Sequence, residues 1–169
     1  MQPLSFYENI VPLVAPIDGG AGSPATPYLD LKGANTATIL IYFGVVTSVT
    51  ATDTLTVTVE ASSASTSNAS ETAIAFNYRL SDTVAGGNTW GAYSAATSAG
   101  LSMGASTVFD GFALEISLDP AAVQAAHAGA RWVRAVLTPS AAFSVLLYTV
   151  IGFIQPTDRA TTMQTQTVT

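Results

Sequence analysis

The sequence predicts an all-β fold, an antiparallel β-sandwich of the jelly-roll type with one short helical turn. Seven or eight segments have the apolar patterns of strands, and several of them place apolar residues at every second position, the periodicity of a strand with one buried face. Turn-forming residues separate these segments at intervals of about 8 to 12 residues, as they do in sandwiches and barrels. Only one segment carries the signals of a helix start, and 169 residues are sufficient for one domain.

Two segments near the C-terminal end are expected to form the centre of this fold. Residues 131–138 alternate in polarity, and the positions expected to point inward are Val133, Ala135 and Leu137. After a turn at Pro139, residues 142–154 are apolar on both faces, which predicts a central strand covered on both sides. Residues 36–47 have the same two-faced pattern and predict a second central strand.

The remaining strands are shorter. Their predicted ranges are residues 28–31, 54–61, 73–81, a weaker strand at 89–93, and 107–118. Segments of small polar residues at 62–72 and 95–104 predict loops. The helix is predicted over residues 120–126, with Asp119 as its N-cap, Pro120 at the first helical position and its end near Gly129.

Both ends of the chain differ from this pattern. Residues 1–27 are rich in proline and glycine and predict an extended arm, residues 28–156 form the jelly-roll sandwich, and residues 157–169 form an extended Thr/Gln-rich tail. The arm also holds apolar side chains, so it is expected either to fold back on its own domain or to lie on a neighbouring molecule. On the second alternative, residues 1–17 and the tail would be the chief intersubunit contacts.

The composition predicts an unusually uncharged surface. Charged residues make up 9% of the chain, against about 25% in typical soluble domains. The 28 Ala, 16 Ser and 23 Thr account for 67 of the 169 residues, so much of the surface is small and weakly polar. Interface cores are poor in charge, so this surface suits contact with other proteins. The alternative explanation is a halotolerant or alanine-rich host composition.

Charge and cysteine content exclude several classes of partner and site. The net charge is −6, and the four arginines are dispersed, which argues against a nucleic-acid partner. The absence of cysteine excludes disulfides and thiolate zinc sites. The longest apolar run, residues 141–154, is shorter than a membrane helix of about 20 residues. No targeting segment is recognisable at the N-terminus, so we expect a protein that is soluble when made and has no membrane partner.

No catalytic, cofactor or metal constellation is recognisable. His127 is the single histidine, and it has no serine or cysteine elbow to act with. The eleven carboxylates are spread singly, and the closest pair, Glu115 and Asp119, is divided between a strand and a helix cap. We therefore expect no enzyme activity and no bound cofactor or metal.

Three short motifs carry a family resemblance. They are Tyr-Leu-Asp-Leu at residues 28–31, Gly-Ala-Arg-Trp-Val-Arg at 129–134, and Phe-Ile-Gln-Pro at 153–156. In this arrangement the chain resembles the capsid cement, or decoration, proteins of tailed bacteriophages, in particular the jelly-roll type known from Bordetella phage. The resemblance implies a virion protein that is made in the host cytoplasm and then binds the outside of an icosahedral head. There it would bridge major capsid proteins as a small homo-oligomer, a dimer or a trimer.

Eight residues are candidates for the interfaces of such a protein. They are Phe6, Ile10, Val11, Leu13, Trp90, Tyr93, Trp132 and Arg134. Arg134 is expected to tie its strand to a loop rather than to bind a ligand.

Two other functions stay open. The segment 131–134 also resembles a strand of galactose-binding-like sandwiches, and Trp90 and Tyr93 could stack on a sugar in a carbohydrate-binding module. The chain could also be a neck, tail or head-fibre component of the virion, which composition does not distinguish from a cement protein.

Overall fold

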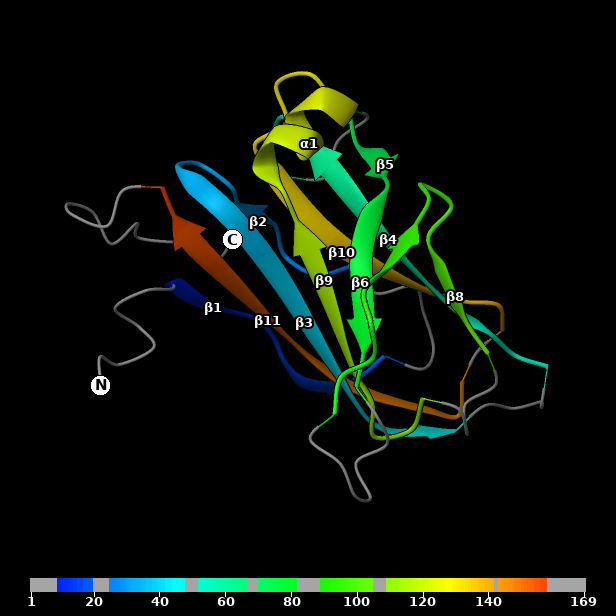
Figure 1. The fold of residues 1–169 in the computed structure, drawn as a ribbon. Helices are drawn as coiled ribbons and strands as arrows, with labels where there is room; N and C mark the ends of the chain where they lie inside the picture. The colour runs from blue at the N-terminus through cyan, green and yellow to red at the C-terminus, as the bar shows by residue number, and fades with distance from the viewer. Residues whose placement is uncertain are drawn as a thin grey trace, which may run out of the picture.

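The protein is a sandwich of two antiparallel sheets (Figure 1). The computed structural model describes residues 9–19, 25–47, 52–66, 70–81, 89–104, 109–141 and 143–157. Sheet A has the strand order β1 (Asn9–Asp18), β11 (Val145–Pro156), β3 (Ala34–Thr47), β9 (Ala113–Leu118), β6 (Phe76–Leu80) and β7 (Ser94–Ala96). Sheet B has the order β2 (Leu29–Asp30), β10 (Trp132–Pro139), β4 (Leu55–Ser62) and β5 (Thr72–Ile74), and β8 (Leu101–Met103) also pairs with β4.

The strand order is that of a jelly roll, which confirms the predicted fold class. Sheet A contains β1, β11, β3 and β9 as neighbours, and sheet B contains β2, β10, β4 and β5. Strands β1 to β4 therefore alternate between the two sheets. β1 and β3 both pair with β11, and β2 and β4 both pair with β10, which is the arrangement of two interlocked Greek keys. Strands β6 and β7 extend sheet A beyond β9.

The core lies between the inner faces of the two sheets. In β10 the residues predicted to point inward, Val133, Ala135 and Leu137, are all 0% exposed, and so are the alternate residues Leu55, Val57 and Val59 of β4. Three buried rings of the core meet edge to face. Phe109 lies 5.3 Å from Phe43 and 6.4 Å from Phe143 between ring centroids, the geometry that aromatic quadrupoles favour.

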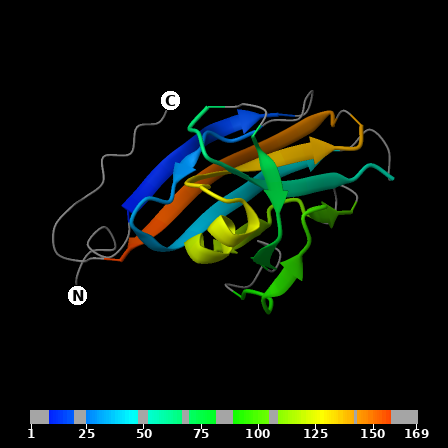
Figure 2. The ribbon, with the colours of Figure 1, turned by 90° about the horizontal axis from the view of Figure 1, so that it is seen from above.

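The single helix of the described residues, α1 (Pro120–Ala126), begins as predicted. The side chain of Asp119 accepts a hydrogen bond from the amide of Ala121 at 2.9 Å, and Pro120 occupies the first helical position. The helix lies at one end of the sandwich, at the top of Figure 1, and Figure 2 looks down on it. Val123 anchors the helix there because its side chain is buried in the core.

Two predicted strands are corrected by the structure. Residues 73–81 do not form one strand, because β5 pairs with β4 in sheet B and β6 pairs with β9 in sheet A. The chain thus passes from one sheet to the other at Ala75 while the inward alternation continues. Residues 89–93 form no strand beyond an isolated bridge between Trp90 and Ser81.

The predicted loop at 95–104 holds most of β7 and all of β8. These two strands also belong to different sheets, and the turn between them requires Gly100, whose φ is +90°. A Cβ at this position would lie 2.6 Å from the carbonyl oxygen of Val57, so this close approach of two backbones excludes any larger residue.

The N-terminal segment is extended, but it folds back on its own domain from Asn9 onward. β1 pairs with β11 as the edge strand of sheet A, so the sandwich begins well before the predicted boundary at residue 27. Residues 1–8, including Phe6, and residues 158–169 of the predicted tail lie outside the described residues. At the start of the tail, the amide of Thr157 donates to the carbonyl oxygen of Gly33 at 2.9 Å.

Candidate interaction surfaces

The outer side of sheet A carries apolar side chains across β1, β11 and β3. Ile10 pairs with Phe153, and in the next row Pro12, Ile151 and Leu40 lie side by side. We call this surface the apolar face. It consists of Ile10, Pro12, Leu40, Tyr42, Val45, Leu147, Ile151 and Phe153, none of which is buried.

Nothing among the described residues covers the apolar face. Ile10 is 42% exposed, Tyr42 41%, Val45 54% and Leu147 39%. The central positions predicted for β3 and β11 are confirmed, but the prediction that β11 is covered on both sides is not met by the described part of the chain. An antiparallel sheet that faces water usually presents polar residues at these positions, so the composition is that of a contact surface.

The outer side of sheet B is polar by contrast. The outward residues of β4 and β10 are Thr56, Thr58, Glu60, Trp132, Arg134, Val136 and Thr138. Hydroxyl and charged groups therefore make up most of this outer side, whereas the outer side of sheet A is largely apolar. The two outer faces of the sandwich offer different chemistry to a partner.

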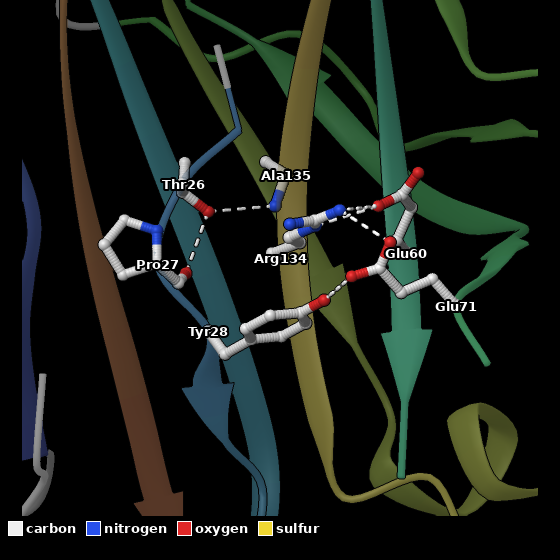
Figure 3. Close-up of polar contacts among 7 residues, drawn as sticks. All are labelled: Thr26, Pro27, Tyr28, Glu60, Glu71, Arg134 and Ala135. Atoms are coloured by element: carbon white, nitrogen blue, oxygen red, sulfur yellow. Dashed lines mark hydrogen bonds and ion pairs between the residues drawn. The ribbon is translucent and has the colours of Figure 1, made fainter. Parts of the chain in front are cut away.

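Arg134 organises the polar side of sheet B (Figure 3). Its Nε donates a hydrogen bond to Glu60 at 2.8 Å, and its Nη2 donates to Glu71 at 2.7 Å. The hydroxyl of Tyr28 donates to the same Glu71, and the guanidinium lies 5.0 Å from the centroid of the Tyr28 ring. Arg134 thus ties its strand to a neighbouring strand and to the residue preceding β5.

This cluster is largely withdrawn from water. The side chains of Arg134, Glu60 and Glu71 are only 14%, 24% and 16% exposed. Burial and the hydrogen bond to Glu71 raise the pKa of Tyr28 to about 12, so its hydroxyl remains a donor at neutral pH. The cluster therefore has the properties of a structural clamp on the outer side of sheet B, across its two central strands β10 and β4.

The segment before β2 completes this clamp. The hydroxyl oxygen of Thr26 accepts a hydrogen bond from the amide of Ala135 at 3.0 Å and donates one to the carbonyl of Pro27 (Figure 3). The amide of Thr26 donates to the carbonyl of Ala135 at 2.8 Å. These bonds hold the chain along β10 beyond the two residues of β2.

A second ion pair lies where β2 meets β10. Nε of Arg131 donates to Asp30 at 2.7 Å, and Nη2 of the same guanidinium contacts the other carboxylate oxygen. Burial opposes ionisation of Asp30, but hydrogen bonds from Arg131 and from the amide of Lys32 outweigh it and hold the pKa of this carboxyl below its usual value. Arg131 also lies 4.8 Å from the ring centroid of Trp132 and covers part of this half-buried side chain.

A third cluster lies at the β6 side of sheet A. Arg79 pairs with Glu115 at 2.6 Å, and the hydroxyl of Tyr93 donates to the other oxygen of Glu115. The guanidinium lies 4.8 Å from the centroid of Trp90 and 4.9 Å from that of Tyr93. Trp90 and Tyr93 are 38% and 53% exposed, so this cluster presents two aromatic rings at the surface.

The structure places the predicted interface residues that it describes in three different settings. Ile10, Trp90 and Tyr93 lie at the surface, whereas Trp132 and Arg134 are engaged by neighbouring side chains. Two of the predictions are corrected. Val11 and Leu13 are 2% and 5% exposed, because they are the inward-facing residues of β1, and they pack in the core of their own domain.

Sequence reasoning missed the carboxylates that meet the arginines. Glu60 and Glu71 are eleven positions apart and share Arg134, although the sequence placed Glu115 and Asp119 as the closest acidic pair. The alternation of apolar and polar residues along β4 and β10 predicts that Glu60 and Arg134 point outward. It does not predict their pairing, because that depends on β4 and β10 being neighbours.

An open pocket of about 360 Å³ lies beside α1. Its lining residues are Leu31, Lys32, Gly33, Ala34, Pro120, Gln124, Gly129, Ala130 and Arg131. The ionisable side chains of this lining are both cations, so these residues do not form an acid/base pair. His127 lies near the same end, where its Nδ1 is 2.9 Å from the hydroxyl of Thr72.

In the described part of the chain, no three acidic, histidine or cysteine side chains gather as a metal site would require, and no helix has the length and apolar character to cross a membrane. No protein-family model matches the sequence, and no curated protein matches it significantly.

Proposed function

We propose that this protein is a virion structural protein, a cement or decoration protein that binds the outside of an icosahedral phage head and stabilises contacts between major capsid proteins. The observation that carries the proposal is the apolar face, a broad sheet surface that the described residues leave uncovered. The family resemblance of residues 28–31, 129–134 and 153–156 supports the same role.

The distribution of charge supports an assembly role. Arg79, Arg131 and Arg134 are each paired with a carboxylate of the same chain, so their charges are neutralised internally. With a net charge of −6, this arrangement offers no groove for nucleic-acid phosphates. The proposed partners are the major capsid protein and further copies of this chain, on the outer surface of the capsid, and the role involves no catalysis.

The clamps support the mechanical part of this role. A cement protein has to resist outward pressure on the shell without unfolding. The Arg134 cluster joins β10 and β4 to the residue before β5, and the Arg131–Asp30 pair joins the residue before β10 to β2. These charge-assisted contacts connect all the strands along the sheet B path, which stiffens that side of the sandwich.

The copy number per particle tests the proposal. Quantitative mass spectrometry of purified virions should find this protein at the abundance of the major capsid protein or at a simple fraction of it. A handful of copies per particle would instead assign the chain to the neck, the tail or a head fibre. Complete absence from the particles would overturn the virion role.

A carbohydrate-binding module is a second candidate, which the Arg79 cluster favours. Trp90 and Tyr93 are both exposed and flank a guanidinium that is itself paired with Glu115, so aromatic surface and polar groups lie together. Binding on a glycan array that is lost in Trp90→Ala would support this function. Absence of binding to any glycan would remove it.

A further inference from the structure

The pocket beside α1 combines buried apolar walls with exposed cations. Its volume of about 360 Å³ falls within the roughly 300 to 1,000 Å³ of small-molecule sites. Its ionisable lining residues, Lys32 and Arg131, are both exposed. Its buried lining residues are all apolar, and we call them the apolar floor: Leu31, Ala34, Pro120 and Ala130. The pocket thus offers positive charge and hydrocarbon surface to one ligand.

Positive charge is scarce elsewhere in this chain. The net charge is −6, and the sequence holds one lysine and four arginines. Of the cations in the described part of the chain, Arg79 and Arg134 are paired with carboxylates on the sheets, whereas Lys32 and Arg131 line this one pocket. A concave surface lined by one sign of charge raises the local concentration of ligands of the opposite sign. The pocket therefore favours an anion.

The carboxylates that adjoin the pocket in the chain, Asp30 and Asp119, are not among its lining residues. The side chain of Asp30 is only 12% exposed and is held by Arg131. That of Asp119 accepts the capping hydrogen bond from the amide of Ala121. The charges that line the pocket itself are therefore those of the two cations.

The donors of the pocket suit a carboxylate. A guanidinium has five N–H donors and an ammonium has three. Arg131 gives the hydrogens of its Nε and one of its Nη2 to Asp30, and its side chain is 44% exposed, so donors remain for a ligand. Charge-assisted hydrogen bonds from such donors to a carboxylate are stronger than neutral ones. The apolar floor beside them fits a short hydrocarbon body.

We propose that this pocket binds a small organic carboxylate, with the carboxylate group at Lys32 and Arg131 and the hydrocarbon body on the apolar floor. The site lies beside α1, the helix on which Figure 2 looks down, and shares no residue with the apolar face. The proposal goes beyond the assembly role and does not depend on it.

Titration of the isotope-labelled full chain with benzoate, followed through its assigned amide resonances, tests the site. The native chain should bind benzoate with a Kd of about 1 mM or tighter. The largest shifts should occur at Gly33, Gly129 and Arg131, which line the pocket. Acetate has the charge with little hydrocarbon, and benzyl alcohol has the hydrocarbon without the charge. Each should bind at least about 10-fold more weakly than benzoate.

A charge variant tests the role of the cations. Lys32→Gln removes one cation but keeps the backbone amide that bonds Asp30, and it should weaken benzoate binding about 5-fold or more. The matched control is Thr138→Glu, which changes the net charge by the same amount at an exposed position near the other end of β10. This control should bind benzoate as the native chain does.

The amide spectra of both variants establish that the fold is retained. Absence of benzoate binding at about 20 mM would overturn the proposal, as would shifts confined to residues outside the pocket. Equal affinity for acetate would remove the apolar floor from the site, and equal affinity for benzyl alcohol would remove the cations, so either result would also overturn it. The same holds for a Lys32→Gln variant that binds benzoate as tightly as the native chain.

Discussion

Replacing Arg134 with methionine should destabilise the fold strongly for a residue on an outer face. The variant loses hydrogen bonds of 2.8 and 2.7 Å to Glu60 and Glu71 and leaves both carboxylates, 24% and 16% exposed, without their cation. Exposed pairs contribute about 0 to 1 kcal/mol, whereas breaking a buried pair costs about 3 to 5 kcal/mol. The partial burial of this cluster places the expected loss near 3 kcal/mol, or about 6 to 12 °C in Tm.

Urea unfolding followed by tryptophan fluorescence measures this loss, because Trp132 lies two positions from the substitution. The matched control combines Arg134→Met with Glu60→Gln and Glu71→Gln. It removes the unpaired charges and should recover a large part of the lost free energy. A loss below about 0.5 kcal/mol in the single variant would mean that the pairs behave as exposed ones. An equal loss in the triple variant would refute the argument from unpaired charge.

Three other positions test separate contacts. Because the pKa of Asp30 is held below its usual 3.8, its carboxylate contributes stability above about pH 4 that is lost as the pH falls through the folded pKa. The difference in unfolding free energy between the native chain and Asp30→Asn should therefore narrow from neutral pH toward acid, and a constant difference would contradict this. The pKa of Tyr28 is raised from 10.0 to about 12, so its contribution is present below pH 10 and is lost between these values as the pH rises. Ultraviolet titration should show that Tyr28→Phe lacks a component that ionises near pH 12, and loss of a component near pH 10 instead would be evidence against the Glu71 contact. Gly152→Ala would place a Cβ 2.7 Å from Cδ1 of the fully buried Leu29, so urea unfolding should show a loss of about 1 to 3 kcal/mol, and unchanged stability would contradict the tight packing.

Local patterns predicted the strands and the helix well. Leu55, Val57 and Val59 point inward as their spacing requires, because alternation along a strand is a property of the backbone alone. Asp119 caps α1 for a similar reason, since capping involves only the residues that follow it in the chain. These features needed no information about distant segments.

The errors have a common physical cause. The alternation of apolar residues over positions 73–81 is compatible with one strand and equally with two strands. The structure has two, which meet at Ala75 and belong to different sheets. Trp90 and Tyr93 have the residue types of a strand, but their rings pack on Arg79 instead. In each instance a tertiary contact decided between conformations that the local pattern allows equally.

The sequence by itself determined an all-β sandwich with two apolar central strands and an unusually uncharged surface. Only the tertiary structure decided which side chains meet, because Arg134 and Glu60 are 74 positions apart and become neighbours through the register of β10 and β4. It also decided which side of β11 is enclosed. The inner side faces the core, whereas the outer side forms part of the apolar face, since a two-layer sandwich covers only one side of each sheet.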